Sequence, residues 1–469
     1  MTSQFDLIIK HMTHLLFIGL GRIGLPQSLV FAKKDFQVFG YDHDVQLQQM
    51  LQEKKPPFYE SKLAEYLQTT LNSTFHPIPD WPGVTQVLSK IDAIFFTLGT
   101  SVPDSQLCLE ENELNLDTIQ TTLAKIFDEK IKKGVALIFR TTLPLGSIDR
   151  LKKWIEEKYG IVEGNDFHLA FVPERLMEGR AIHEEETLPK IIGTYTDASF
   201  SIIKAIFEKL DGKIIRVKNP RTAEFCKLTD NSFRNTLFAF ANEIAMHASE
   251  NNVDVREVIN AVNTDYARNT IQQPGFVSGY CLGKDPYIFE YGFNRAASEQ
   301  DPFHSLWYYG RRTNDYLINY IVHKFMKKLA GIKDPVICIL GLSFKENIDD
   351  FRMSHAITIM QKLMERGVKK FKVFDPSLDK NKYTMLPSAI ANNVIYKTHH
   401  LDTALFSETH AALIAHRHTE IAQFNQKINL TGLVSVMEKP AYLFDAWNAW
   451  REAIDIPHLD YDALGLGGM

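Results

Sequence analysis

The sequence has 469 residues, of which 45% are hydrophobic and 23% charged, so a disordered or fibrous protein is excluded and about three domains are expected. Its 52 basic and 57 acidic residues leave a formal net charge of −5, which does not favour a nucleic-acid partner. No apolar run approaches the ~18 to 20 residues of a membrane span, and the four cysteines form neither a disulfide framework nor a metal-binding motif.

The first part of the chain, from residue 14 to about residue 193, alternates short apolar runs with longer amphipathic segments. Runs of this length, bounded by glycine and proline, are typical of buried parallel strands joined by helices. The expected strands are Leu15–Leu20, Gln37–Tyr41, Ala93–Leu98, Val135–Phe139, His168–Val172 and Lys190–Gly193. We assign residues 1–212 to a first α/β domain, with residues 1–13 as an extension. No secretory signal pattern precedes the first strand, so a cytoplasmic protein is expected.

The middle of the chain has a different pattern. From Arg221 to Asn251 there is no proline or glycine, and a second stretch from Asp301 to Lys328 carries apolar residues at steps of three and four. Both stretches predict long helices. A helical central domain is therefore expected over residues 213–332.

The alternation of strands and helices returns after residue 334. The expected strands are Val336–Leu340, Phe371–Phe374, Val394–Tyr396, Ala411–Ala415 and, as the last, Tyr442–Asp445. A turn over Gly341–Ser354 and a helix over Ala356–Arg366 follow the first strand, and residues 333–469 form a second α/β domain. The predicted fold class is α/β, with two doubly wound Rossmann-like domains flanking a helical central domain.

A glycine-rich motif follows the first expected strand and opens a helix. Gly19, Gly21 and Gly24, in the spacing GxGxxG, allow a tight turn and the close approach of a pyrophosphate to the helix N-terminus. The second strand is followed by Asp42, whose carboxylate can accept from ribose hydroxyls and would repel a 2′-phosphate. These residues favour NAD over NADP. The alternative is a structural turn with a solvated aspartate.

One cysteine differs from the other three in its surroundings. Cys281 lies in a segment, Pro274–Pro286, that is expected to be a loop, and Lys284 and Asp285 follow it closely. A nearby ammonium group favours the thiolate, which is the nucleophilic form. On local composition alone, two interpretations of this cysteine remain possible, a reactive thiol and an ordinary loop cysteine.

A lysine and an asparagine share one face of the first long helix. Lys227 and Asn231 are four residues apart, so their side chains lie on the same side of that helix. Such a pair can stabilise a developing alkoxide or oxyanion. A solvated helix face is the alternative interpretation.

Taken in chain order, these motifs resemble those of the UDP-glucose/GDP-mannose dehydrogenase family, and the likeness covers nearly the whole chain. The further motifs that carry the resemblance are Arg140–Pro144, Pro173–Gly179, Glu224–Lys227 with Asn231, Gly279–Cys281 with Lys284 and Asp285, and Gly341–Lys345 with Asp349, Arg352 and Ser354. Any one of them would be weak, whereas the ordered set is specific.

The resemblance implies an NAD-dependent, four-electron oxidation of the C6 hydroxyl of a UDP-sugar to a uronic acid, for cell-surface polysaccharide precursors. Cys281 matches the nucleophile that forms a thiohemiacetal and then a thioester. Lys227 and Asn231 match the groups that stabilise the oxyanions. The residues that match those ordering water and moving protons are Glu174, Thr142 and Asp285.

The resemblance also implies the residues that bind the ligands, with no metal ion. Those expected to contact NAD are Gly19, Gly21, Arg22, Ile23, Gly24, Asp42, Thr100, Thr142, Glu178, Lys284 and Arg352. Those expected to contact the UDP-sugar are Arg175, Leu176, Lys227, Asn231, Arg268, Phe276, Gly279, Phe344 and Lys345. Arg268 is placed like the arginine that the family lends to a neighbouring subunit, so a homodimer or a higher homo-oligomer is expected. No membrane partner is expected.

Several residues depart from the family pattern. Arg22 stands where tyrosine or phenylalanine is usual, and Trp447 stands where many relatives have a substrate-binding arginine. Ser278 and Tyr280 alter a substrate loop that is one residue short. These departures concern the identity of the sugar and leave the type of chemistry unchanged. Pro173–Arg175 resembles the branch that acts on UDP-N-acetylhexosamines, so we expect such a sugar in preference to UDP-glucose.

Two other functions are compatible with parts of the sequence. A two-electron 3-hydroxyacid dehydrogenase also has a GxGxxG domain and a lysine–asparagine helix pair, but it needs neither Cys281 nor a second α/β domain. A catalytically inactive protein that binds NAD or a nucleotide sugar would not need the set that is retained here, namely Cys281, Lys227, Asn231 and Asp285.

Overall fold

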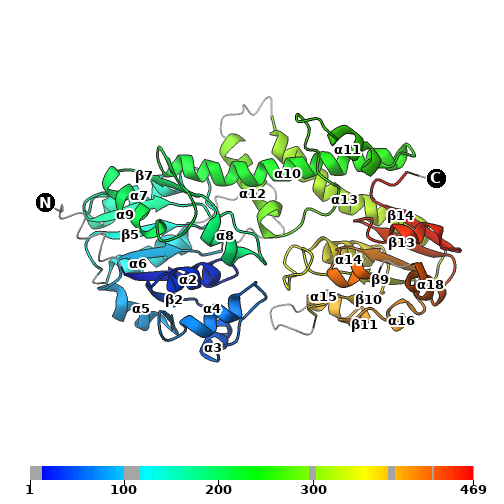
Figure 1. Ribbon diagram of the computed structural model, residues 1–469, viewed down its shortest axis with the longest axis horizontal. Helices are drawn as coiled ribbons and strands as arrows, with labels where there is room; N and C mark the ends of the chain where they lie inside the picture. The colour runs from blue at the N-terminus through cyan, green and yellow to red at the C-terminus, as the bar shows by residue number, and fades with distance from the viewer. Residues whose placement is uncertain are drawn as a thin grey trace. The chain divides into compact units, whose positions relative to one another are not determined.

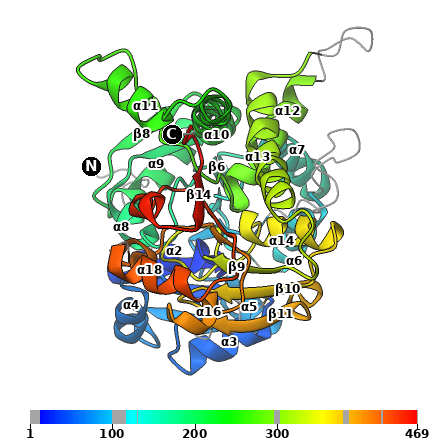
Figure 2. The ribbon, with the colours of Figure 1, turned by 90° about the vertical axis from the view of Figure 1, so that its right-hand side faces the viewer.

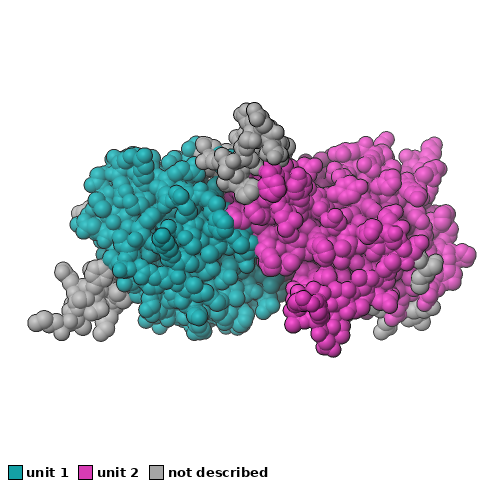
Figure 3. Space-filling model, turned by 90° about the horizontal axis from the view of Figure 1, so that it is seen from above, with its two compact units in different colours: residues 1–230, 291–296 teal, residues 231–290, 297–469 magenta. Residues whose placement is uncertain are grey.

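The computed structural model describes residues 13–99, 116–129, 131–294, 303–378, 386–424 and 427–467. The chain divides into two compact units, which Figure 3 distinguishes by colour. Unit 1 comprises residues 1–230 and 291–296, and unit 2 comprises residues 231–290 and 297–469. Within the described ranges, no helix has the length and the apolar character required to cross a membrane.

Unit 1 contains an eight-stranded sheet with the strand order β3-β2-β1-β4-β5-β6-β7-β8. The strands are β1 (His14–Ile18), β2 (Gln37–Tyr41), β3 (Phe75–Ile78), β4 (Ala93–Phe96), β5 (Val135–Phe139), β6 (Phe167–Phe171), β7 (Lys190–Thr194) and β8 (Ile214–Val217). The six strands predicted from apolar runs are confirmed, whereas β3 and β8 were not predicted. Neighbouring strands are parallel except for β6 and β7, so the expectation of an entirely parallel sheet is wrong at that pair.

Aromatic side chains bury both faces of this sheet. On one face Phe95 stacks on Phe17 at 4.4 Å between ring centroids, and on the other face Phe96 stacks on Phe139 at 4.4 Å. Because successive strand residues point to opposite faces, such runs need helices on both sides. The helices of unit 1 before residue 220 are α2 (Gly24–Lys33), α3 (Val45–Gln52), α4 (Leu63–Thr70), α5 (Trp81–Leu88), α6 (Asp117–Phe127), α7 (Ser147–Tyr159), α8 (Ala181–Thr187) and α9 (Asp197–Phe207) (Figure 1).

The two long helices predicted in the middle of the chain are confirmed. They are α10 (Pro220–Glu250) and α13 (Leu306–Lys328), and the side chain of Ser305 caps α13 by accepting the N–H of Tyr308. Two further helices are α11 (Val255–Asn263) and α12 (Tyr280–Asn294). The expected loop around Cys281 is therefore wrong, because the helix α12 begins one residue before the cysteine.

The sheet of unit 2 has six strands in the order β11-β10-β9-β12-β13-β14, and all neighbouring pairs are parallel. Figure 2 labels β9, β10, β11 and β14 of this sheet. The strands are β9 (Val336–Leu340), β10 (Lys370–Phe374), β11 (Val394–Thr398), β12 (Ala411–Ile414), β13 (Ala441–Asp445) and β14 (Leu459–Ala463). The expectation that the strand at residues 442–445 ends the series is wrong, because β14 follows it. The helices are α14 (His355–Glu365), α15 (Ser388–Ala391), α16 (Thr403–Phe406), α17 (Thr419–Gln423), α18 (Lys427–Ser435) and the 3₁₀ helix η2 (Arg451–Asp455).

The same turn follows the first strand of each sheet. Gly19 after β1 has φ +99°, and Gly341 after β9 has φ +87°, both in the left-handed region that favours glycine. The next residue in each case donates its N–H to an aspartate at the end of the neighbouring strand. Asp42 accepts from the Leu20 N–H at 2.6 Å, and Asp375 accepts from the Leu342 N–H at 2.8 Å. Both turns lie at the carboxyl ends of parallel strands, where this fold class binds ligands.

Candidate active site

The glycine turn of unit 1 is tightly packed at one position and open at another. A Cβ added at Gly24 would lie 2.0 Å from the carbonyl oxygen of Gly19, whereas a Cβ at Gly21 would meet nothing within 4 Å. Helix α2 begins at Gly24, and the Leu25 N–H of its first turn already donates to the Gly21 carbonyl oxygen at 3.1 Å. Because nothing lies beside Gly21, a pyrophosphate can approach the backbone closely there, at the positive end of the α2 dipole.

Asp42 presents a carboxylate beside the turn. One of its oxygens accepts the Leu20 N–H, the other accepts the Asp44 N–H at 2.9 Å, and its side chain is still 11% exposed. A cavity of about 360 Å³ lies next to it, lined among others by Gly19, Asp42 and Trp81. The open turn, the cavity and the partly exposed carboxylate fit NAD.

Two residues expected to contact the cofactor are brought together. A guanidinium nitrogen of Arg22 lies 3.6 Å from a carboxylate oxygen of Glu178, and the guanidinium lies 5.1 Å from the centre of the Phe58 ring. Ile23 precedes α2 without a side-chain cap. Thr100, also expected to contact the cofactor, lies outside the described residues.

Lys227 and Glu174 form a buried ion pair in unit 1. The Lys227 ammonium donates to the backbone oxygen of Glu174 at 2.6 Å and to its carboxylate at 2.8 Å, and the other carboxylate oxygen accepts the Leu176 N–H at 3.0 Å. Burial raises the pKa of Glu174, but the charge and hydrogen bond of Lys227, the Leu176 N–H and the charge of Arg140 together outweigh it, so the pKa lies below its ordinary value. Glu174 is therefore ionised at neutral pH. Arg175 instead donates to the backbone oxygen of Pro189 at 3.1 Å.

Thr142 lies in the connection between β5 and α7, and buried ionic groups hold both ends of that connection. At one end Arg140 pairs with Glu185, and both side chains are almost completely buried. At the other end Glu224 accepts two backbone N–H groups at the start of α7, at 2.7 and 2.9 Å. Burial raises the pKa of Glu224 to about 7. The sequence pointed to Glu224 only as part of a motif, because its partners lie more than 70 residues away.

Cys281 is the second residue of α12 and is exposed. Gly279 just before the helix has φ +90°, and a Cβ there would lie 2.5 Å from the Phe344 ring, so glycine is required on both grounds. The free N–H groups of a first helical turn carry partial positive charge and favour a thiolate. Of the two interpretations left open by the sequence, this position supports the reactive thiol.

A buried polar cluster lies one turn further along α12. The carboxylate of Asp285, which has no exposed surface, accepts from the Asn231 side-chain amide at 2.6 Å and from the Lys284 ammonium at 2.8 Å. Lys284 also lies 5.1 Å from the centre of the Tyr280 ring. The structure thus joins Asn231 to Asp285, 54 residues apart in sequence, a contact that no local pattern could predict.

The other candidates of unit 2 surround the start of α12. Phe276 is 6% exposed, and the Ser278 hydroxyl donates to the backbone oxygen of Phe344 at 2.7 Å. Lys345 follows Phe344 in the turn after β9. The Arg352 guanidinium lies 5.6 Å from the centre of the Tyr280 ring, and Tyr280 directly precedes Cys281 in the first turn of α12. These contacts bring the expected substrate loop and the turn after β9 together.

Arg268 and Trp447 have different surroundings. Arg268 is exposed in the segment after α11, where its guanidinium contacts Tyr266. Trp447 donates its indole N–H to the backbone oxygen of Ala415 at 2.7 Å and packs against Gly275, where a Cβ would lie 2.5 Å from the ring. Among the described side chains, no group of three or more histidine, cysteine, aspartate and glutamate residues is placed to hold a metal ion.

Family comparisons agree with this arrangement. Three family models match the chain in order, those of the NAD binding domain, the central domain and the UDP binding domain of the UDP-glucose/GDP-mannose dehydrogenase family. They cover residues 13–211, 221–316 and 338–452 respectively.

Individual relatives extend over most of the chain. A UDP-N-acetyl-D-mannosamine dehydrogenase of Campylobacter jejuni is 31% identical over 418 residues, which are 87% of this chain and 95% of the relative. An NDP-N-acetyl-D-galactosaminuronic acid dehydrogenase of Ralstonia solanacearum is 30% identical over 375 residues, which are 77% of this chain and 82% of the relative. The solved structure of a UDP-D-ManNAc dehydrogenase from Pyrococcus horikoshii has the same fold, with a TM-score of 0.80, 24% identity, and coverage of 97% and 99%. The chain belongs to the UDP-glucose/GDP-mannose dehydrogenase family of NAD-dependent nucleotide-sugar dehydrogenases.

Proposed function

We propose that this protein oxidises the C6 hydroxyl of a UDP-N-acetylhexosamine to the carboxylate, with transfer of four electrons to two molecules of NAD. The observation that carries the proposal is the exposed Cys281 in the first turn of α12, followed by the buried Lys284 and Asp285. A thiol at a helix N-terminus is a nucleophile for an aldehyde. A two-electron alcohol oxidation would not need it.

The proposed steps balance in atoms and electrons. The C6 alcohol loses a hydride and a proton to give the aldehyde, and the Cys281 thiol adds to its carbonyl group to form a thiohemiacetal. Loss of a second hydride and a proton gives the thioester, which water hydrolyses to the carboxylate and the free thiol. In sum, one alcohol, one water and two NAD give one carboxylate, two NADH and three protons.

The side chains of α10 suit the charge that develops on the substrate oxygen. Lys227 and Asn231 lie one turn apart on this helix, and both are donors. We assign to them the stabilisation of the alkoxide and of the later oxyanions. Asp285 holds the Asn231 amide in place, and the ionised Glu174 is assigned as the base that accepts a proton from the hydrolytic water, with Thr142 helping to order that water.

The proposed cofactor contacts lie on the glycine turn and on the segments around it. Gly19, Gly21 and Gly24 would hold the pyrophosphate and Asp42 the ribose, and Arg22 with Glu178 would lie nearer the nicotinamide. When bound, NAD supplies the hydride acceptor for each oxidation. The chain's own contribution is to bind and orient the cofactor, and Asp42 selects against a 2′-phosphate.

The proposed sugar follows from the named activities of the relatives. The relatives from Campylobacter jejuni and Ralstonia solanacearum both carry 2-acetamido sugars in their names. We assign the nucleotide to the UDP binding domain, with Phe344 and Lys345 in the turn after β9 and Phe276 and Gly279 in the loop before α12. The segment with Arg175 and Leu176 is assigned to the sugar end.

We also propose that the protein is at least a homodimer built on α10. Phe225, Phe233 and Phe240 are 49%, 61% and 53% exposed, and their spacing of eight and seven residues places them on one face of the helix. A row of three exposed phenylalanines is typical of a protein interface. Arg268, exposed in the segment after α11, is assigned to the substrate of the neighbouring subunit.

The test is NADH formation across a panel of UDP- and GDP-sugars, with NADH and acid product counted per molecule of sugar consumed. The expected result is two NADH and one carboxylate, with UDP-N-acetylhexosamines as the preferred substrates. Cys281→Ala, which leaves the glycine turn untouched, is the control. One NADH per sugar, or full turnover by Cys281→Ala, would contradict the thioester pathway and favour the two-electron reaction.

A further inference from the structure

Helix α12 contains a proline close to the proposed nucleophile. Pro286 lies inside the helix, six residues after its start. In a regular α-helix the N–H of residue 286 would donate to the carbonyl oxygen of Leu282. Proline has no N–H, so the carbonyl next to Cys281 loses its helical donor. Some other group has to bind that carbonyl if the first turn is to keep its geometry.

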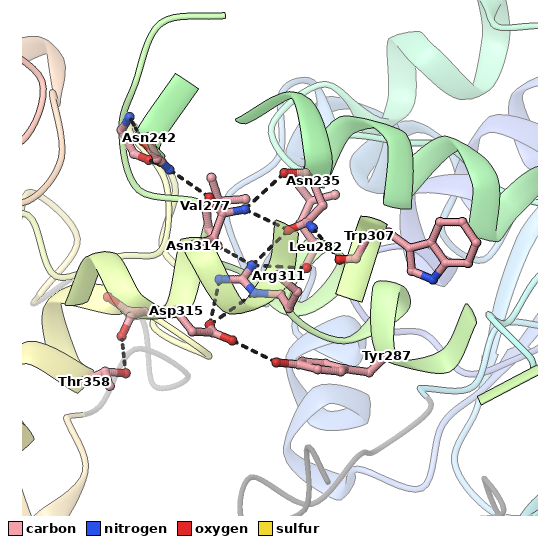
Figure 4. A network of polar contacts seen from close by, with 12 residues as sticks. Asn235, Asn242, Val277, Leu282, Tyr287, Trp307, Arg311, Asn314, Asp315 and Thr358 are labelled. Carbon is pink, nitrogen blue, oxygen red and sulfur yellow. Dashed lines mark hydrogen bonds and ion pairs between the residues drawn. The ribbon is translucent and has the colours of Figure 1, made fainter. Parts of the chain in front are cut away.

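The side chain of Arg311 supplies a donor to this carbonyl. Its guanidinium nitrogen Nη1 lies 3.3 Å from the Leu282 oxygen and 2.9 Å from the oxygen of Val277, in the loop before α12. Arg311 belongs to α13 and is only 1% exposed. Figure 4 shows its guanidinium between these carbonyl groups on one side and Asp315 on the other.

A carboxylate fixes the orientation of this guanidinium. Asp315 accepts from Nε of Arg311 at 3.1 Å and from Nη2 at 2.7 Å, and its second oxygen accepts from the Tyr287 hydroxyl at 3.0 Å. Tyr287 lies on α12, directly after Pro286. Arg311 and Asp315 are therefore bonded to α12 at two points, on either side of the proline (Figure 4).

The other end of the loop is held by neighbouring amides. The Asn242 side chain accepts the N–H of Gly275 at 2.8 Å and donates to the oxygen of Gly275 at 2.9 Å. Asn242 also donates to Asn314, one turn along α13 from Arg311, at 2.8 Å. The loop that precedes Cys281 is thus bonded to α10 at its start and to Arg311 near its end.

We propose that Arg311 is a positioning residue that holds the first turn of α12, and with it Cys281, in the geometry required for attack on the aldehyde. The proposal rests on the proposed role of Cys281 as nucleophile. An arginine suits this task because its planar guanidinium donates in several fixed directions, here to Asp315 and to two carbonyl groups at once. A lysine has a single point charge and cannot reach both sides.

The first test compares Arg311→Met and Arg311→Lys with Arg312→Met, the exposed arginine next to it on α13. Misplacement of a nucleophile by about 1 Å can reduce a rate by roughly 100-fold. We expect Arg311→Met to lower kcat by about that factor and to slow alkylation of Cys281 by iodoacetamide, followed by mass spectrometry of its peptide. In Arg311→Lys kcat should fall by about 10-fold, and in Arg312→Met it should equal that of the wild type. NADH affinity measured by fluorescence should change much less than kcat, because the glycine turn and Asp42, which are assigned to the pyrophosphate and the ribose, lie in unit 1.

The second test restores the missing donor. Pro286→Ala returns an N–H to position 286, so the Arg311→Met/Pro286→Ala double variant should recover kcat by about 10-fold over Arg311→Met. The recovery should stay incomplete, because the Val277 carbonyl still lacks its partner. A double variant no faster than Arg311→Met, or Arg311 variants that match Arg312→Met, would overturn the proposal. If Arg311→Met fails to fold, the test rests on Arg311→Lys, and an Arg311→Lys variant with the kcat of the wild type would also overturn the proposal. Failure of the thioester pathway is distinguished by the wild-type ratio of NADH to sugar.

Discussion

Removing the Lys227 ammonium should affect stability and catalysis separately. Lys227 and Glu174 have side-chain exposures of 3% and 10%, so Lys227→Met leaves a carboxylate buried without its cation. Breaking a buried pair in this way costs about 3–5 kcal/mol, which for a unit of about 200 residues lowers Tm by about 6–20 °C. The matched control is Lys152→Met, which breaks a half-buried pair with Glu156 on α7 and should cost at most about 1 kcal/mol.

The pH dependence identifies Glu174 as the origin of this loss. In the wild type Lys227 keeps the pKa of Glu174 below its ordinary value, so the pair stabilises the fold above the unfolded pKa and is lost as pH falls. In Lys227→Met the lowering by Lys227 is lost and burial, the largest influence, remains, so the pKa of Glu174 rises and the variant loses stability as pH rises. The Tm difference should therefore widen from about pH 5 to about pH 8.

A double variant separates the two effects. Lys227→Met/Glu174→Gln removes the buried charge and should recover most of the Tm measured by scanning calorimetry. Turnover should stay at least about 10²–10³-fold below the wild type, because the oxyanion donor and the assigned base are both missing. The reasoning would be refuted by a double variant no more stable than Lys227→Met, or by a Tm difference that does not change with pH.

Four further predictions follow from single features. Cys281→Ala should abolish complete turnover while NADH still binds, and an active alanine variant would contradict this. Cys281→Ser should accumulate an ester that raises the mass of the enzyme by that of a nucleotide sugar, because an ester hydrolyses more slowly than a thioester. Asp42→Ala should narrow the preference for NAD over NADP in kcat/KM, and an unchanged preference would show that another group excludes the 2′-phosphate. Glu224 has a pKa of about 7 in the folded protein, above its unfolded value, so its contribution to stability is present at low pH and is lost as pH rises through 7. The Tm of the wild type, measured relative to that of Glu224→Gln, should therefore fall between about pH 5 and about pH 8. The fall should correspond to about 3 kcal/mol in the free energy of unfolding. Phe233→Asp with Phe240→Asp should convert the oligomer seen by sedimentation into a monomer, and a wild-type protein that sediments only as a 53.7 kDa active monomer would rule out the dimer.

The central strands and one edge strand, β11, could be predicted from sequence, and the other three edge strands could not. β5 and β9 match the predicted residues at both ends, because a strand covered on both faces is a continuous apolar run. β3, β8 and β14 were missed, and each lies at an edge of its sheet. An edge strand is partly exposed and needs fewer apolar residues, so β3 contains His76 and Pro77, and β14 alternates with Asp460 and Asp462.

The candidate site was predictable where it depends on local motifs. The glycine turn with Asp42, and the exposed Cys281, were both identified from short spacings. The start of α12 was not, because Pro286 argues against a helix and the group that compensates for it, Arg311, comes from another helix. Such compensation depends on tertiary contacts and leaves no periodic signal.

The two glycine turns differ in a way that bears on the order of events during turnover. In the turn after β9, Ser343 occupies the place that Gly21 has in the first turn, and it is fully buried. Asp375 has no exposed surface, in contrast to Asp42. Of the two turns, only the first therefore offers room for a dinucleotide, yet the proposed oxidation consumes two. The first NADH has to depart and a fresh NAD has to enter while the half-oxidised sugar stays tethered to Cys281. Carbonyl traps such as hydroxylamine, added during turnover, should then fail to divert the aldehyde into solution.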